Sequence, residues 1–157
     1  MLSKGEIDAL YSATAPSSLS DPNVDYLFPD FKAVEEDYYR RTNIFPIMHV
    51  IAIKRSVYNS NRWIVKSLQK TFRRAMEIAW DELEERGSLR VMLPWLDDHV
   101  RETRRVFGKE RYWEDGLEEN RICLEKFLEY SFKQGLAKRK WNVEDIFAKE
   151  SLEDFVV

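Results

Sequence analysis

The residues of this chain best suited to chemistry lie in one short stretch, YYRRTNIFPIMH, at positions 38–49. His49 stands inside an apolar run that extends from Ile47 to Ile53. An imidazole group titrates near ~pH 6.5, so a histidine can hold or deliver a proton close to neutral pH. Two roles are open to His49: a proton donor beside a cleft, or a core histidine whose ring nitrogens bond a carbonyl or a carboxylate.

A pair of arginines precedes this histidine by a short connection. Arg40 and Arg41 follow two tyrosines at the predicted end of a helix, where positive charge interacts favourably with the helix dipole. A guanidinium group can also bind a carboxylate through two parallel hydrogen bonds. The arginines are therefore either solvated charges at a helix end or ligands of an anionic group near His49.

The composition restricts the class of protein. The chain has 157 residues with a formal net charge of −3, 44% hydrophobic residues and one cysteine. This balance predicts a globular domain and argues against nucleic acid as a partner, because phosphate binding needs a basic face. A single cysteine and two distant histidines provide neither an intrachain disulfide nor a zinc-binding spacing, so no metal is predicted.

The sequence shows no targeting or membrane-spanning pattern. No stretch approaches the ~20 apolar residues that a membrane helix requires, and the first residues lack a signal-peptide pattern. We therefore expect a cytoplasmic protein with no membrane partner. The first residues also resemble the middle of a structural unit, so we expect the N-terminal half of a larger fold to be absent.

Hydrophobic periodicity predicts mainly helices. They cover residues 31–41, 62–86, 94–108 and 117–134, with a short helix after Asn142. Asp30 is an expected N-terminal cap, and Asn142 with Asp145 is another. Gly108 is the expected end of its helix. Two strands are predicted, at residues 6–12 and 47–53.

The strand predicted at residues 47–53 is apolar on both faces, as strands buried in parallel sheets are. One further strand cannot pair all of its backbone groups. We expect the neighbouring strands to come from another chain or from the absent N-terminal half. The predicted class is therefore α/β, helix-rich with few strands. Exposed apolar surface should make the purified chain dimerise, aggregate or bind a hydrophobic dye, so a homo-oligomer is among the expected states.

Asn120 and Arg121 form a polar pair near the start of the helix predicted at residues 117–134. Both side chains can make several hydrogen bonds. We expect them to fix another segment of the chain rather than to bind a ligand.

Several blocks of the sequence resemble the 4,5-dihydroxyphthalate decarboxylase family. They are YYRRTNIFPIMH (38–49), GLEENR (116–121), GEIDAL (5–10) and LPWL (93–96). This family is similar in fold to the type II periplasmic binding proteins, in which two α/β lobes enclose a ligand. The resemblance covers the C-terminal half of that fold. It implies that residues 1–22 end the second lobe and cross the hinge, and that residues 23–157 form the C-terminal part of the first lobe.

The resemblance also implies a reaction. Members of the family remove CO2 from 4,5-dihydroxyphthalate and leave 3,4-dihydroxybenzoate, with a small aromatic dicarboxylate as substrate and no cofactor. His49 would protonate the ring carbon, and Arg40 and Arg41 would hold the carboxylates. The expected substrate contacts, some in the loop after the first predicted strand, are Ser12, Ser17, Ser18, Tyr39, Phe45 and Trp95.

Two alternatives stay open at this point. The chain could be a ligand-binding module of the solute-binding type that lacks the reaction. It could also be a truncated fragment without activity of its own.

Overall fold

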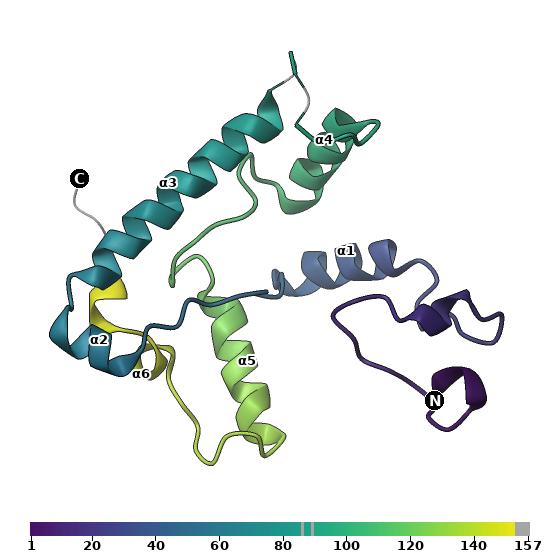
Figure 1. Cartoon of the computed structure of the whole chain (residues 1–157), viewed down its shortest axis with the longest axis horizontal. Helices are drawn as coiled ribbons and strands as arrows, with labels where there is room; N and C mark the ends of the chain where they lie inside the picture. Colours follow the sequence, from purple (N-terminus) through teal and green to yellow (C-terminus); the bar gives the residue numbers. More distant parts are fainter. Residues whose placement is uncertain (86, 89, 153–157) are drawn as a thin grey trace. The chain divides into compact units, whose positions relative to one another are not determined.

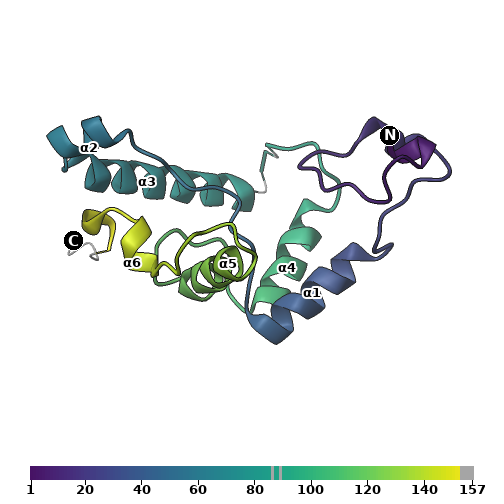
Figure 2. The ribbon, with the colours of Figure 1, turned by 90° about the horizontal axis from the view of Figure 1, so that it is seen from below.

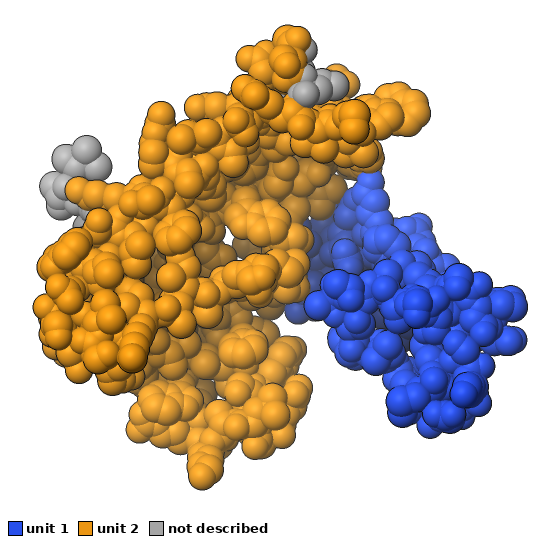
Figure 3. Space-filling view, in the orientation of Figure 1, with its two compact units in different colours: residues 1–41 blue, residues 42–157 orange. Residues whose placement is uncertain are grey.

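The chain forms two compact units, residues 1–41 and residues 42–157, and each is described by itself (Figure 3). The computed structural model describes residues 1–85, 87–88 and 90–152. The first unit contains short 3-10 helices η1 (Leu2–Lys4) and η2 (Ser17–Ser20) and nearly all of helix α1 (Phe31–Thr42). The second contains α2 (Arg55–Ser60), α3 (Ile64–Glu84), α4 (Leu96–Phe107), α5 (Arg121–Lys133), α6 (Val143–Ile146) and η3 (Lys149–Ser151) (Figure 1).

Both strand predictions are wrong for this structure. Residues 6–12 and 47–53 have no regular secondary structure, and the described residues contain no strand. The predicted α/β class is therefore replaced by a helical one over the described residues, and the periplasmic-binding-protein-like fold stays a prediction. A strand is stable only when neighbouring strands pair its backbone N–H and C=O groups. The described residues supply no such neighbours, so neither segment forms a strand. The predicted lobe boundary between residues 22 and 23 also stays a prediction.

The predicted helices are confirmed; α1 runs one residue beyond its predicted end, and the other helices have shorter bounds than predicted. The backbone N–H of Ala33 donates to the Asp30 carboxylate at 3.1 Å, so Asp30 caps α1 as expected. Gly108 ends α4 in the left-handed conformation (φ 67°), and its N–H donates to the Arg104 carbonyl at 2.8 Å. Asn142 and Asp145 make the predicted capping box of α6. Local sequence signals thus account for these three helix ends, although α2 was not predicted.

The core of the second unit is small and lies between α5 and α6. Leu124, Leu128 and Val143 are buried there, with Ile47, Leu117, Trp141 and Phe147 packed against them. Figures 1 and 2 show the short α6 beside α5, in agreement with their contacts. Ile47 thus attaches the segment before α2 to this core.

A cluster of aromatic rings forms a second centre of packing in this unit. The Phe45 ring lies edge-on to Phe107, with centroids 5.2 Å apart, and to Trp113 at 5.5 Å. Tyr112 contacts both Phe107 and the buried Trp80. Residues 44–47 are therefore held by α4, α5 and the residues around them.

Polar contacts join η3 to α2 and α3. The Tyr58 hydroxyl donates to the Glu150 carboxylate at 2.7 Å, and Arg62 lies 3.4 Å from the same carboxylate. The carboxylate acceptor raises the pKa of the Tyr58 hydroxyl and, in turn, the hydroxyl lowers the pKa of Glu150. These contacts link residues about ninety positions apart, which gives the unit its main long-range polar connection.

Much apolar surface remains uncovered. The chain exposes 13007 Å² to solvent, whereas a folded monomer of 18.8 kDa is expected to expose about 8,300 Å². Two separate globular units of the same total mass would expose roughly 9,800 Å² by the same scaling. The excess includes the middle of residues 46–53 (PIMHVIAI), hereafter the apolar segment, where Met48, Val50 and Ile51 are exposed.

Within residues 1–85, 87–88 and 90–152, no helix combines the length and the apolar character needed to span a membrane.

Candidate functional site

His49 lies in the apolar segment, between its attached end and α2. Its side chain is exposed, and it makes no hydrogen bond or ion pair within the described part of the chain. The prediction that it sits in a buried strand is wrong for this structure. Ile44, Phe45 and Ile47 nevertheless hold the segment just before it, so the position of His49 is tethered although its ring is not oriented.

Arg40 and Arg41 occupy the last turn of α1, as predicted from the charge order. A guanidinium nitrogen of Arg40 lies 2.5 Å from the Glu36 carboxylate, and Arg41 Nε lies 2.8 Å from that of Asp37. Both pairs join residues four apart on α1; the Arg41–Asp37 pair is exposed, whereas the Glu36 side chain is partly buried. Exposed ion pairs contribute roughly 0–1 kcal/mol, so another carboxylate can displace the Arg41–Asp37 pair at small cost.

The three serines take part in local turns of the first unit. Ser12 Oγ donates to the Thr14 carbonyl at 2.6 Å and accepts from the Thr14 N–H at 3.3 Å. Ser17 and Ser18 lie in η2, where their carbonyl groups accept from Ser20 Oγ and from the Asp21 N–H. These bonds are typical of serine in turns, and contact with a substrate stays a prediction.

The predicted aromatic contacts have different surroundings. Tyr39 is partly buried on α1, whereas the Phe45 ring packs against Phe107 and Trp113. Trp95 is 78% exposed and precedes α4 with a left-handed backbone, φ 58°. Such a conformation is uncommon for a bulky residue and fixes how the chain enters α4. Phe45 thus has a packing role in this structure in addition to the predicted one.

The predicted site residues are divided between the two units. The first unit holds Ser12, Ser17, Ser18, Tyr39, Arg40 and Arg41. The second holds Phe45, His49 and Trp95. Their convergence on one ligand stays a prediction.

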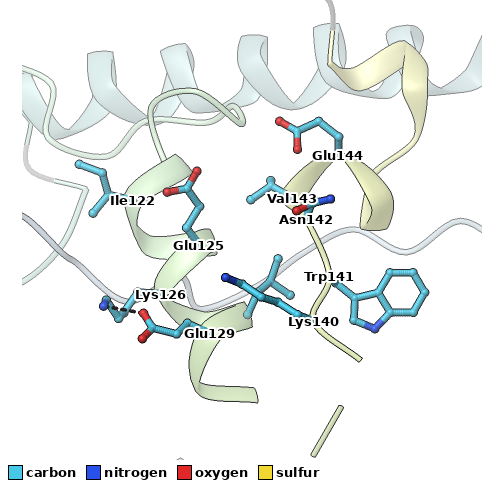
Figure 4. Close-up of a pocket in the computed structure, with 10 residues that line it drawn as sticks. Ile122, Glu125, Lys126, Glu129, Lys140, Trp141, Asn142, Val143 and Glu144 are labelled. Carbon is cyan, nitrogen blue, oxygen red and sulfur yellow. Dashed lines mark hydrogen bonds and ion pairs between the residues drawn. The ribbon is translucent and has the colours of Figure 1, made fainter. Parts of the chain in front are cut away.

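A pocket of about 420 Å³ lies between α5 and the residues that lead into α6 (Figure 4). Its charged lining residues are Glu125, Lys126, Glu129, Lys140 and Glu144. Three carboxylates against two amines make it a poor site for a dicarboxylate substrate, because like charges repel. The pocket contains none of the predicted site residues.

Asn120 and Arg121 fix the chain around this pocket, as predicted. Asn120 Nδ2 donates to the carbonyls of Glu114 and Gly116 at 2.9 and 2.8 Å. Arg121 pairs with Glu118 in the turn before α5 and with Glu144 of α6, 2.8 Å away. The hydrogen bonds that Arg121 donates to Glu118 and Glu144 raise the pKa of Arg121. A backbone hydrogen bond to the Glu144 carboxylate lowers the pKa of Glu144, and Arg121 lowers it further. The pair therefore holds α6 against the start of α5.

The Glu129 carboxylate, at one side of the pocket, is paired with two lysines. Lys126 Nζ lies 2.7 Å away, and Lys133 forms a second ion pair. Hydrogen bonds from Lys126 and Lys133 hold the pKa of Glu129 at about 2. A carboxyl whose pKa falls on folding stabilises the fold above its unfolded pKa, and this contribution disappears as the pH falls through the folded value.

We therefore expect Glu129 to keep its charge down to about pH 2 and its stabilising effect to disappear between about pH 4.5 and pH 2. A side-chain NMR titration of the chain should show a midpoint for Glu129 well below that of an ordinary glutamate. Replacing both Lys126 and Lys133 by methionine should return it toward the ordinary value, and Lys138→Met should leave it in place. An ordinary midpoint in the unmodified chain would show that these pairs do not form in solution.

Sequence reasoning missed the pocket between α5 and α6, although it identified the cap at Asn142 and the Asn120–Arg121 pair. The only signal was the amphipathic pattern of charges on α5, which is also typical of a solvated helix face. Within the described ranges, no group of three or more histidine, cysteine, aspartate or glutamate side chains is placed to hold a metal ion.

Comparison with known proteins connects the chain to an enzyme. No protein-family profile matches it. A 4,5-dihydroxyphthalate decarboxylase of Comamonas testosteroni is 31% identical over 159 residues, a match that covers 100% of this chain and 48% of that protein. The chain thus spans about half the length of this relative. The resemblance found in the sequence is confirmed: the chain is related to the 4,5-dihydroxyphthalate decarboxylase family through about half of that protein.

Proposed function

We propose that this chain supplies part of a decarboxylase that acts on an aromatic dihydroxy-dicarboxylate, with 4,5-dihydroxyphthalate as the substrate and 3,4-dihydroxybenzoate as the product. The observation that carries the proposal is the 31% identity to the Comamonas testosteroni enzyme along the whole chain. A match of this length includes every one of the predicted site residues, from Ser12 to Trp95.

The substrate requires groups that bind two adjacent carboxylates. Arg40 and Arg41 are neighbours at the C-terminal end of α1 and carry fixed positive charge. Of their present partners, Asp37 is exposed and weakly held, and Glu36 is partly buried. A dianion that offers four carboxylate oxygens would replace these pairs with charge-assisted hydrogen bonds.

The chemical step requires a proton for the ring carbon. As the bond to the departing carboxylate breaks, its electron pair stays on the ring and CO2 leaves. The hydroxyl group para to that carbon donates electron density to the ring. His49 in its protonated form delivers the proton to the carbon, and the neutral imidazole regains one from water. Ser12, Ser17, Ser18, Tyr39, Phe45 and Trp95 would surround the ring.

The direct test uses a hybrid protein. In it, the part of the Comamonas testosteroni decarboxylase that matches this chain is replaced by residues 1–157. The hybrid should release CO2 from 4,5-dihydroxyphthalate and should be inactive toward phthalate, which lacks the para hydroxyl. A folded hybrid that releases no CO2, beside an active parent enzyme, would refute the proposed reaction.

Replacing Arg40 or Arg41 by glutamine in the hybrid should raise KM for 4,5-dihydroxyphthalate about 10-fold or more. Hydrogen bonds to charged groups contribute about 1.5–3 kcal/mol each, and glutamine keeps a polar side chain but is shorter and loses the charge. Arg105→Gln is the matched control, since the side chain of Arg105 is 68% exposed and that of Arg41 is 63% exposed. Steady-state kinetics measure the effect. Equal KM values for all three variants would mean that the arginines are solvated helix-end charges.

A ligand-binding module without the reaction is the second candidate. The exposed and unoriented His49 favours it, because a general acid has to be held near the atom it protonates. Calorimetry on the hybrid separates the two functions. Binding of 4,5-dihydroxyphthalate without CO2 release would select the binding module.

A further inference from the structure

We propose that the pocket between α5 and α6 binds a free α-amino acid with an apolar side chain. The Lys140 ammonium group would hold the carboxylate of the ligand, and the Glu125 carboxylate would hold its ammonium group. This inference does not depend on the proposed reaction.

Two charged residues that line the pocket keep their charged groups available. Lys140 makes no hydrogen bond or ion pair with another residue of the described part of the chain. The Glu125 carboxylate lies 3.7 Å from Arg121, which is beyond hydrogen-bond distance, and its side chain is 60% exposed. The pocket therefore offers a ligand one ammonium group and one carboxylate group.

The other charged residues of the lining are already paired. Glu129 forms ion pairs with Lys126 and Lys133, and Glu144 lies 2.8 Å from Arg121. Paired charges attract a ligand less than unpaired ones, so the two available groups decide which ligand fits. A dicarboxylate would bring its second carboxylate toward an acidic side chain, and a diamine would bring its second ammonium group toward a lysine. A zwitterion matches both available charges.

The apolar part of the lining suits an aliphatic side chain. It comes from Ile122 and Leu128 of α5 and Val143 of α6. Leu128 and Val143 belong to the small core, so this wall is fixed, whereas Ile122 is 53% exposed. A bound apolar side chain would cover Ile122, which favours binding. The volume of about 420 Å³ lies within the ~300–1,000 Å³ of small-molecule pockets.

Lys140 lies between neighbours that are held in place. Trp141 packs against the core, and the guanidinium carbon of Arg139 lies 3.5 Å from the centre of its ring. Asn142 begins the capping box of α6. Figure 4 shows the Lys140 side chain extending toward α5, the helix that carries Glu125. The backbone on both sides of Lys140 is thus organised before a ligand binds, which reduces the entropic cost of binding.

Backbone amide NMR spectra of the free chain, titrated with L-leucine, test the site. The signals of residues 122–129 and 140–144 should shift, with half-saturation below about 10 mM, while the signal of Phe45 should stay in place. Shifts that are still proportional to the leucine concentration at about 10 mM would overturn the proposal.

Two analogues test the two contacts separately. Leucinamide keeps the ammonium group but lacks the carboxylate, and isocaproate keeps the carboxylate but lacks the ammonium group. Each should bind about 10-fold or more weakly than leucine, because each loses one charge-assisted hydrogen bond. Either analogue binding as tightly as leucine would overturn recognition of a zwitterion.

Substitutions of the two residues should reproduce these losses selectively. Lys140→Met should weaken binding of leucine about 10-fold and leave binding of leucinamide unchanged. Glu125→Gln should weaken binding of leucine to a similar degree and leave binding of isocaproate unchanged. Lys138→Met and Glu119→Gln are the matched controls, since both residues are exposed and neither lines the pocket.

The controls should bind leucine as the unmodified chain does. Equal affinity for leucine in all four variants would overturn the proposal. Equal weakening of leucine and leucinamide by Lys140→Met would also overturn it, because the substitution would then disturb the whole pocket rather than one contact.

Discussion

Replacing His49 by asparagine in the hybrid protein should lower the rate of decarboxylation by about 100-fold or more while substrate binding persists. Asparagine keeps a polar side chain of similar size but cannot donate a proton in the pH range where imidazole titrates. A positioned general acid contributes typically 100- to 10,000-fold to a rate. Steady-state CO2 release measures kcat, and calorimetry measures binding of 4,5-dihydroxyphthalate.

His99→Asn is the matched control, because His99 is the other histidine of the chain and lies exposed on α4. It should leave kcat within a factor of two of the parent hybrid. A His49 variant that is as active as this control would assign the proton transfer to the part of the hybrid that comes from the relative.

Trp80→Ala should destabilise the second unit by about 3–5 kcal/mol, the usual cost of truncating a buried large aromatic residue. Trp80 on α3 is 4% exposed and packs edge-on against Tyr112, with ring centroids 4.8 Å apart. A loss of this size is a large part of the stability of an ordinary domain. Urea unfolding of the free chain, followed by far-ultraviolet circular dichroism, measures it.

Trp63→Ala provides the comparison, since Trp63 directly precedes α3 and is 67% exposed. Its effect should stay below about 1 kcal/mol. Equal effects of the two substitutions would show that the packing of Trp80 against Tyr112 does not stabilise the chain in solution.

The helices were predictable because their signals are local. Asp30 lies next to the helix it caps, the Asn142–Asp145 box spans four residues, and Gly108 directly follows α4. Each signal depends on a few adjacent residues, so it acts whatever the rest of the chain does. The Asn120–Arg121 pair was also predictable, since most of its partners lie in the turn just before α5 and one, Glu144, lies on α6.

The strand could not be predicted in the same way. The alternation of apolar residues in 47–53 describes how the segment would pack, but a strand exists only beside other strands. These neighbours are not among the described residues, so the segment is irregular and exposed here. The same absence leaves His49 without fixed neighbours. The sequence could therefore identify His49 as a residue type suited to proton transfer, but it could not predict how the imidazole ring is oriented.

The arginines show a further limit of the sequence. Their place at the end of α1 was predicted from the charge order. Their pairing with Glu36 and Asp37 follows from the four-residue spacing on the helix. These ion pairs compete with the proposed binding of substrate carboxylates. Phe45 was predicted as a substrate contact, and the structure shows its contacts with Phe107 and Trp113. Residue type alone does not separate a ring that lines a site from one that holds the site in place.

Formation of 3,4-dihydroxybenzoate from 4,5-dihydroxyphthalate by the hybrid protein is the most direct test of the central claim, that this chain supplies the decarboxylating part of such an enzyme. The matched part of the relative expressed without its remainder, and the remainder expressed without the matched part, serve as baselines. We predict that the hybrid forms product at a rate well above both baselines. His49→Asn should reduce this rate to about 1% of that of the unmodified hybrid or less. A folded hybrid that forms no product above the baselines would contradict the claim.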